Sequence, residues 1–200
     1  MHGVRTCRRW HKFVHDRLQR GPLALHWGSV GSVKQLHTGH TGPVISCTFA
    51  PDGGTLVTVS SDRTARVWAT GDWSHLCTPT GHIGPVWSCA FAPDGGTLVT
   101  TSFDGTVRGW ATGDWTHRCT LTGHTGLVRS CVFAPDGGTL VTVADDLTAR
   151  VWATGDWSHL RTLTTASSHV CAFASNGNTL VIVCFDSTAR VWADEGSLQQ

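Results

Sequence analysis

Histidine, serine and aspartate recur at a fixed spacing along the chain, and together these side chains could form a hydrolytic triad. The first two sets, 42 residues apart, are His40, Ser60, Asp62 and His82, Ser102, Asp104. In a triad the hydroxyl attacks, the imidazole accepts its proton and the carboxylate orients the imidazole. A catalytic site is normally built once, so a set that returns with each repeat favours a structural role. We therefore expect no catalytic residues and a protein that is not an enzyme.

The same period of 42 residues runs through most of the chain. Stretches that begin at Gly39, Gly81 and Gly123 align without gaps, and a fourth, eroded copy begins at Thr165. The fourth copy is two residues shorter before Cys171 and lacks the Gly-His pair that opens the others. Self-similarity of this length is typical of propeller, solenoid and other repeat architectures.

Each repeat resolves into four short extended segments that must position these side chains. In the first repeat they cover residues 44–50, 55–60, 64–69 and 73–80. The segment TLVTVS at 55–60 is rich in β-branched residues and alternates as a strand does. The Pro-Asp-Gly-Gly sequence at 51–54 is typical of a tight turn. Four strands joined by turns at this period predict one propeller blade per repeat.

These units resemble the WD40 repeat family over roughly residues 33–194. The resemblance rests on the Gly-His pair, the F-A-P-D-G segment, the Ser-x-Asp sequence and the tryptophan that ends the third segment. The Trp-Asp pair of the family reads Trp-Ala here, as at Trp68-Ala69. The resemblance implies an all-β fold, a β-propeller of four-stranded blades with about four repeats. This array is either an incomplete ring or part of a larger propeller.

The resemblance also implies a hydrogen-bonded tetrad in each blade, in which a histidine, a hydroxyl, an aspartate and a tryptophan lock two loops together. A buried indole N–H needs such an acceptor. We expect the members to be His40, Ser60, Asp62, Trp68; His82, Ser102, Asp104, Trp110; His124, Asp146, Trp152; and Asp186, Trp192. Repeat three has Ala144 at the expected hydroxyl position, and repeat four has Cys184 there and no histidine. Losing a partner of a buried network costs about 1–3 kcal/mol, so repeats three and four should be the softer end of the array.

Proteins of this family, as the resemblance implies, are rigid platforms whose top face binds peptides or other domains. The positions expected to point there differ from repeat to repeat while the framework around them stays the same. They are Ile45, Ser61, Trp87, Phe103, Arg129, Asp145 and Phe185. Aromatic side chains dominate binding energy at protein interfaces. We therefore expect Trp87 and Phe103 to anchor a protein partner whose identity the sequence does not reveal.

The organisation that follows has seven parts. They are a basic amphipathic segment at 1–21, with a short helix expected over 6–20, a remnant half-blade at 22–39, repeats at 40–80, 81–122 and 123–163, a degenerate repeat at 164–194 and a tail at 195–200. Four blades leave three arrangements open. The chain forms an open array, pairs with a second copy into an eight-bladed ring, or is a piece of a longer gene product such as a signalling protein.

Charge and cysteine usage narrow the function classes. Residues 1–36 carry seven Lys or Arg and one acid, whereas the rest carry eight Arg and thirteen acids. A basic arm attracts polyanions, so nucleic-acid binding stays an alternative to a protein partner, although we expect neither nucleic acid nor a membrane as the partner. The first 30 residues contain no apolar run suited to a signal peptide or a membrane span.

Cysteines such as Cys47 and Cys89 recur singly without C-x-x-C pairs, so we expect reduced thiols, no metal, no cofactor and a cytoplasmic location.

Overall fold

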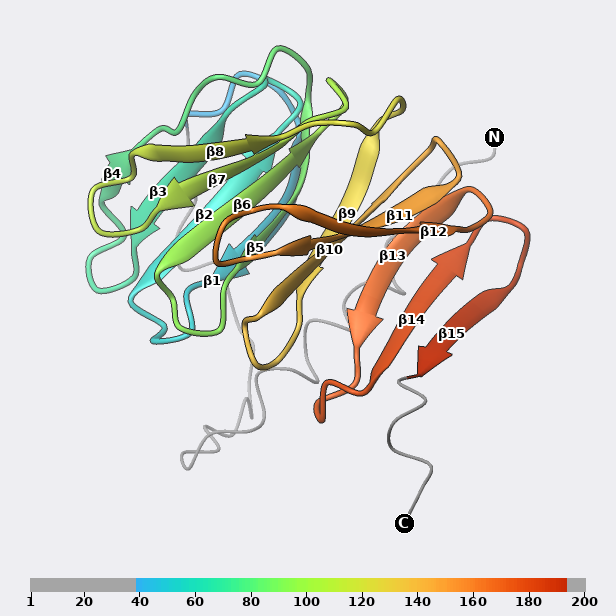
Figure 1. Cartoon of the computed structure of the whole chain (residues 1–200). Coiled ribbons are helices and arrows are strands. Elements are labelled where there is room, and N and C mark those ends of the chain that lie inside the picture. Colours follow the sequence, from blue (N-terminus) through green and yellow to red (C-terminus); the bar gives the residue numbers. More distant parts are fainter. Residues whose placement is uncertain (1–38, 194–200) are drawn as a thin grey trace, which may run out of the picture. The chain divides into compact units, whose positions relative to one another are not determined.

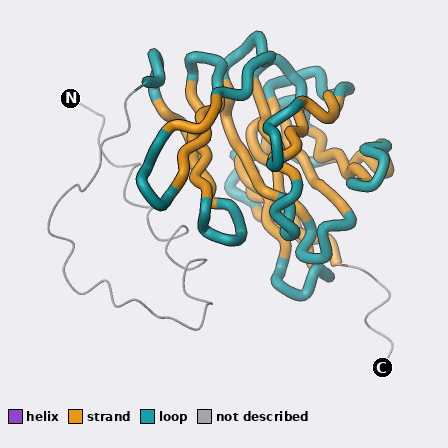
Figure 2. The backbone as a smooth tube through the Cα atoms, turned by 90° about the vertical axis from the view of Figure 1, so that its left-hand side faces the viewer, coloured by secondary structure: helices purple, strands orange, loops and turns teal. Residues whose placement is uncertain are grey.

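The computed structural model describes residues 39–193, and every regular element in that range is a β-strand. Figure 2 shows these strands joined by short loops. No helix long and apolar enough to span a membrane occurs among the described residues. The expected helix over 6–20, residues 22–38 of the half-blade and the tail at 195–200 lie outside the described range.

The strands form four antiparallel sheets, each in sequence order, and each sheet is one blade (Figure 1). Blade one contains β1 (Val44–Phe49), β2 (Thr55–Ser60), β3 (Ala65–Ala69) and β4 (His75–Cys77). Blade two contains β5 (Val86–Phe91), β6 (Thr97–Ser102), β7 (Val107–Ala111) and β8 (His117–Leu121). Blade three contains β9 (Val128–Phe133), β10 (Thr139–Ala144), β11 (Thr148–Ala153) and β12 (His159–Thr164). Blade four has three described strands, β13 (Ser168–Phe173), β14 (Thr179–Cys184) and β15 (Ala189–Ala193).

Local chemistry sets the strand ends as the repeat pattern predicts. In blade one the turn between β1 and β2 is closed by a bond from Gly53 N–H to Ala50 O at 2.9 Å, with Gly53 at a φ of 74°. The Asp52 carboxylate accepts the Gly54 N–H at 2.8 Å, an Asx arrangement that favours the turn. The fourth strand is shorter than the expected 73–80, because Trp73 has a φ of 60° and pairing starts at His75.

The apolar core lies between the blades rather than within one sheet. The first strands of neighbouring blades contact each other, β1 with β5, β5 with β9 and β9 with β13. Val59 and Val67 of blade one are fully buried against Val86 and Leu98 of blade two. The same packing recurs between blades two and three and between blades three and four. Each interface therefore joins two different faces of neighbouring blades. The face of one blade that contains Val59 and Val67, or their equivalents, packs on the face of the next blade that contains Val86 and Leu98, or their equivalents.

Candidate functional site

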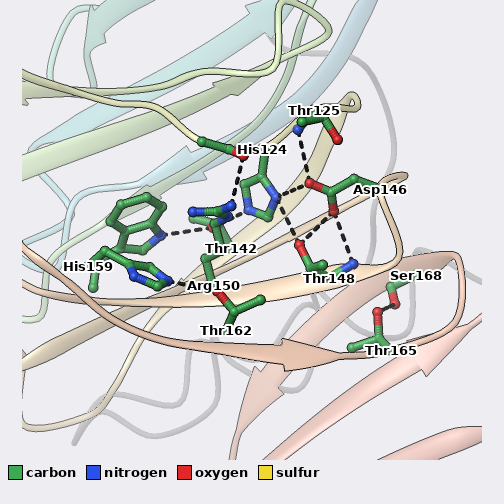
Figure 3. A network of polar contacts seen from close by, with 12 residues as sticks. His124, Thr125, Thr142, Asp146, Thr148, Arg150, His159, Thr162, Thr165 and Ser168 are labelled. Carbon is green, nitrogen blue, oxygen red and sulfur yellow. Dashed lines mark hydrogen bonds and ion pairs between the residues drawn. The ribbon is translucent and has the colours of Figure 1, made fainter.

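A chain of four polar side chains crosses each of the first three blades. In blade three (Figure 3), Trp152 donates its indole N–H to Thr142 Oγ1 at 3.0 Å, and Thr142 Oγ1 lies 2.9 Å from His124 Nε2. His124 Nδ1 lies 2.8 Å from Asp146 Oδ2. Because Thr142 already accepts from the indole, its hydroxyl proton is free for Nε2, which places the imidazole proton on Nδ1. The network ties the loop before the first strand to the turn after the second.

The same four contacts recur in blades one and two at nearly the same distances. Trp68 and Trp110 donate to Thr58 and Thr100 at 3.0 Å. These hydroxyls lie 2.9 Å from the Nε2 atoms of His40 and His82, whose Nδ1 atoms reach Asp62 and Asp104 at 2.8 and 2.9 Å. The histidine and aspartate side chains of all three blades are between 2 and 8% exposed. These three His-Asp pairs are therefore largely shielded from solvent.

The hydroxyl expected in this network was assigned to the wrong residue. Ser60 and Ser102 were expected, but the hydrogen bond from the indole N–H is accepted by Thr58 and Thr100, two residues earlier on the same face of the strand. Ser60 lies at the strand end, where its Oγ donates to Gly42 O at 3.0 Å and accepts the Asp62 N–H at 3.1 Å. Serine therefore braces the loop, and threonine completes the tetrad.

Because the hydroxyl comes from threonine, the expected completeness of the tetrad changes in blades three and four. Blade three has Thr142, so its tetrad is complete, and the expectation that Ala144 breaks it is wrong. Blade four has Ile182 at the threonine position, as the pairing of Ile182 with Arg190 matches that of Thr58 with Arg66. The two tetrad members expected in blade four, Asp186 and Trp192, make other contacts instead. The exposed Asp186 binds the backbone and hydroxyl of Thr188 at 3.0 and 2.6 Å, and Trp192 packs on the apolar cluster around Ile182.

Burial and hydrogen bonding set the charges in the network. Burial lowers the pKa of His82 and of His124 below the ordinary value, although the bonds to Asp104 and Asp146 partly oppose it. Burial raises the pKa of Asp62, but bonds from Thr64, His40 and two backbone N–H groups outweigh it and hold the pKa well below the usual range. Near neutral pH the networks of blades two and three thus contain a neutral imidazole and an ionised carboxylate.

Acid should destabilise the folded chain in two stages. The folded pKa of His82 and His124 is lowered, so their contribution is complete above about pH 6.5, the unfolded value, and is lost as pH falls toward the folded pKa. The lowered pKa of Asp62, Asp104 and Asp146 gives a second loss below about pH 4. Urea unfolding measured by tryptophan fluorescence should show a midpoint that falls from about pH 7.5 to about pH 5. Replacing both histidines by glutamine should flatten that slope, and a midpoint that does not change over this interval would contradict the assignment.

A β-bulge occurs at the same position in all four first strands. The register shifts there leave one residue of each strand without a partner, namely Ile45, Trp87, Arg129 and His169. A bulge frees the extra residue from the ladder and redirects its side chain, and bulges are frequent beside functional sites. The turn after the second strand begins beside the bulge, because the N–H of Phe103 bonds Pro85 O at 3.0 Å and the N–H of Asp145 bonds Leu127 O at 3.0 Å. The bulged residue and the residue before the turn aspartate are thereby brought to one end of each blade.

These side chains form a continuous cluster across blades two, three and four. The rings of Trp87 and Phe103 lie 4.9 Å apart at 37°. The Arg129 guanidinium lies 5.6 Å from the ring centre of Trp87 and 5.2 Å from that of Phe185, and so it bridges blades two and four. Asp145 holds this guanidinium through two bonds, from Nε at 2.5 Å and from Nη2 at 2.8 Å. We call Trp87, Phe103, Arg129, Asp145, His169 and Phe185 the bulge surface.

The bulge surface is aromatic and carries little net charge. Phe103 and Phe185 are 42% and 48% exposed, whereas Trp87 is half-buried between its neighbours. Arg129 and Asp145 neutralise each other. Burial and the charge of Arg129 lower the pKa of His169, against a smaller opposing effect of Asp145, so the imidazole adds no charge near neutral pH.

The structure thus brings five of the seven expected top-face residues together, and it adds one that sequence reasoning missed. Ile45 and Ser61 occupy the corresponding positions of blade one, where Ser61 donates its backbone N–H to Pro43 O at 3.0 Å. The missed residue is His169, whose ring stacks on Phe185. Its signal was available, since it lies two residues before Cys171 as Arg129 lies two residues before Cys131.

Comparison with known proteins agrees with this repeat structure. A family model described as WD domain, G-beta repeat matches residues 31–69, 73–111, 115–153 and 157–193. Each of the last three matches includes the outer strand of one blade and the first three strands of the next, as 73–111 includes β4 and β5 to β7.

Two curated proteins share short stretches with the chain. One is transcription initiation factor TFIID subunit 5 of Drosophila melanogaster, 44% identical over 48 residues, which are 24% of this chain and 7% of that protein. The other is periodic tryptophan protein 2 homolog of Neurospora crassa, 62% identical over 32 residues, which are 16% of this chain and 4% of that protein. The chain therefore matches less than a tenth of the length of either relative.

Proposed function

The chain belongs to the WD40 repeat family, and from this premise we propose that it is a non-catalytic scaffold that binds a protein partner through the bulge surface. Repeats of this family imply a protein-interaction scaffold in general terms. The observation that carries the more specific proposal is the cluster in which Trp87, Arg129 and Phe185 bring three blades to one exposed aromatic surface.

Support for a non-catalytic role comes from where the reactive side chains are used. The His-Asp pairs of the first three blades are buried and engaged in identical networks. In each of these three blades the His-Asp pair orients the threonine hydroxyl that accepts from a buried indole, so the pair is occupied by a structural task. The variation between repeats lies instead at the bulges and beside the turns, which supports binding specificity at those positions.

The chemistry of the bulge surface favours an extended peptide segment with an aromatic or aliphatic anchor. The exposed rings of Phe103 and Phe185 offer apolar contact area, and Trp and Arg are enriched among residues that dominate interface energy. The ion pair of Arg129 with Asp145 holds the guanidinium close to both rings, 5.6 Å from the centre of Trp87 and 5.2 Å from that of Phe185. A partner thus meets a preorganised surface and loses little entropy in ordering it.

Substitution of the two blade-two aromatics tests this proposal. Linear peptides selected from a displayed library on the intact chain should lose at least about 30-fold in affinity when Trp87→Ala and Phe103→Ala are combined, since anchor residues contribute about 2 kcal/mol or more. Ile83→Ala is the matched control, because Ile83 is 82% exposed in the same blade but lies outside the cluster. Far-UV circular dichroism should be the same for all three proteins. Selected peptides that bind the double variant as tightly as the unchanged chain would refute the proposed site.

A further inference from the structure

A cleft occurs at each of the first two junctions between neighbouring blades, beside the turn that joins the first strand to the second. The cleft between blades one and two has a volume of about 560 Å³, and the cleft between blades two and three has a volume of about 210 Å³. These turns follow the ends of β1, β5 and β9, whereas the bulges lie at the starts of the same strands. The clefts therefore lie at the opposite end of the blades from the bulge surface.

Equivalent side chains, 42 residues apart, line the two clefts. Each cleft has two turn aspartates, the threonine that begins a second strand, the phenylalanine that ends a first strand and the tryptophan before a fourth strand. The larger cleft has Asp52, Asp94, Thr55, Phe91 and Trp115, and the smaller has Asp94, Asp136, Thr97, Phe133 and Trp157. In the larger cleft the two rings lie 6.4 Å apart at 76°. Each cleft thus combines carboxylates with aromatic rings.

The smaller cleft already holds a cation that the chain itself supplies. Arg118 of β8 lines this cleft, and its Nη1 donates to Thr97 Oγ1 at 3.5 Å. The equivalent position in blade one is Leu76. None of the residues between 39 and 193 that line the larger cleft is a lysine or an arginine. Its two carboxylates therefore lack the positive charge that Arg118 brings to the next cleft.

The carboxylates of the larger cleft keep oxygen atoms available for a ligand. Asp52 and Asp94 each use Oδ1 to accept a glycine N–H at 2.8 Å, from Gly54 and Gly96. No residue between 39 and 193 donates to the Oδ2 atom of either aspartate, and both side chains are exposed. A guanidinium donates strong charge-assisted bonds to carboxylates, and it also stacks on aromatic rings such as the indole of Trp115.

We propose that the cleft between blades one and two binds the guanidinium of an arginine side chain from a partner protein. Arg118 in the equivalent cleft is the internal counterpart of this ligand, with the same kind of surroundings. The proposal rests on residues that the bulge surface does not include, so failure of one site leaves the other standing.

Two small compounds test the chemistry of this cleft. N-acetyl-arginine amide has the guanidinium, and N-acetyl-citrulline amide has a neutral urea in its place. In an NMR titration of the intact chain at low salt, where exposed charges are screened least, the arginine compound should shift the indole N–H resonance of Trp115 until it saturates. The citrulline compound should bind at least about tenfold more weakly, because it lacks charge-assisted bonds. A shift of Trp87 in place of Trp115 would overturn the proposal.

Substitutions at one equivalent position should exchange the properties of the two clefts. Leu76→Arg gives the larger cleft an arginine of its own, which competes at a high effective concentration and should weaken binding at Trp115 at least about tenfold. Arg118→Leu removes the arginine from the smaller cleft, so the Trp157 resonance should then respond to the arginine compound. Leu76 is 49% exposed and Arg118 is exposed as well, so both variants should fold, which far-UV circular dichroism checks.

One carboxylate of the larger cleft can be neutralised without loss of its turn. Asp52→Asn should weaken binding at Trp115 about tenfold. Asparagine supports this turn, because Asn176 Oδ1 accepts the Asn178 N–H at 3.1 Å at the equivalent place in blade four. Asp136→Asn is the matched control, since Asp136 lines only the smaller cleft, and binding at Trp115 should not change.

The outcomes that would overturn the proposal are distinct. One is a Trp115 resonance that does not move, and another is equal binding of the two compounds. Unchanged binding in Asp52→Asn or in Leu76→Arg would also overturn it. So would a Trp157 resonance that stays in place in Arg118→Leu, because the removal of Arg118 should free the equivalent site.

Discussion

Thr100→Val should lower the free energy of unfolding by more than about 2 kcal/mol, because it leaves two buried nitrogen atoms without partners. Thr100 is fully buried, and its Oγ1 lies 3.0 Å from Trp110 Nε1 and 2.9 Å from His82 Nε2. Valine has nearly the same shape, so the loss arises from the missing hydrogen bonds rather than from a cavity. Each unsatisfied buried group costs about 1–3 kcal/mol. Urea unfolding monitored by circular dichroism measures the change.

Thr120→Val is the matched control for this substitution. Thr120 Oγ1 also lies 2.9 Å from a histidine, His117 Nε2, but both side chains are exposed. Water replaces the lost bond there, so the change should stay within about 0.5 kcal/mol. The indole N–H resonance of Trp110 gives a second readout, which should move in Thr100→Val and stay in place in Ser102→Ala. Similar losses in the buried and the exposed variant would contradict the role of Thr100.

Backbone amides in β14 should exchange with solvent at least about tenfold faster than those in β2, a difference of about 1.4 kcal/mol in local opening. Both strands are the middle strands of end blades, so the comparison removes the effect of an exposed face. Blade one has the full network on Thr58, whereas blade four has Ile182 there and the shorter Thr165–Ser168 loop in place of the histidine. Hydrogen exchange measured by mass spectrometry or NMR tests this.

Equal protection of the two strands would show that apolar packing alone holds blade four. β10 is the internal reference for that measurement. Its blade has the complete tetrad despite Ala144, so we expect its amides to be protected at least as well as those of β2.

Much of the fold could be predicted because the repeat of 42 residues is visible in the amino-acid sequence. The predicted segments 44–50 and 55–60 agree with β1 and β2 to within one residue, since Pro-Asp-Gly-Gly turns and β-branched alternation act locally. The fourth segment was drawn too long, because the positive φ of Trp73 is not encoded by the type of that residue.

The site was harder to predict than the fold, for two physical reasons. Thr58 and Ser60 lie on one face of the same strand, so alternation cannot separate them, and the choice depends on the reach of the Trp68 indole across the sheet. The contact of Arg129 with Trp87 and Phe185 depends on how three blades pack, which no single repeat specifies. The unpartnered position of the bulged residues follows from pairing register, and register becomes visible only in the folded sheet.

The four β-bulges have a consequence for how this protein can change. The residue at a bulge is left out of the strand pairing, so a replacement there leaves the ladder of paired residues intact. Isoleucine, tryptophan, arginine and histidine already occupy the four equivalent sites. Substitutions at these sites can therefore change ligand preference while the strand framework stays constant. Changes at Trp87, Arg129 and His169 act together, because Arg129 contacts Trp87 and because Arg129 and His169 share the neighbour Phe185.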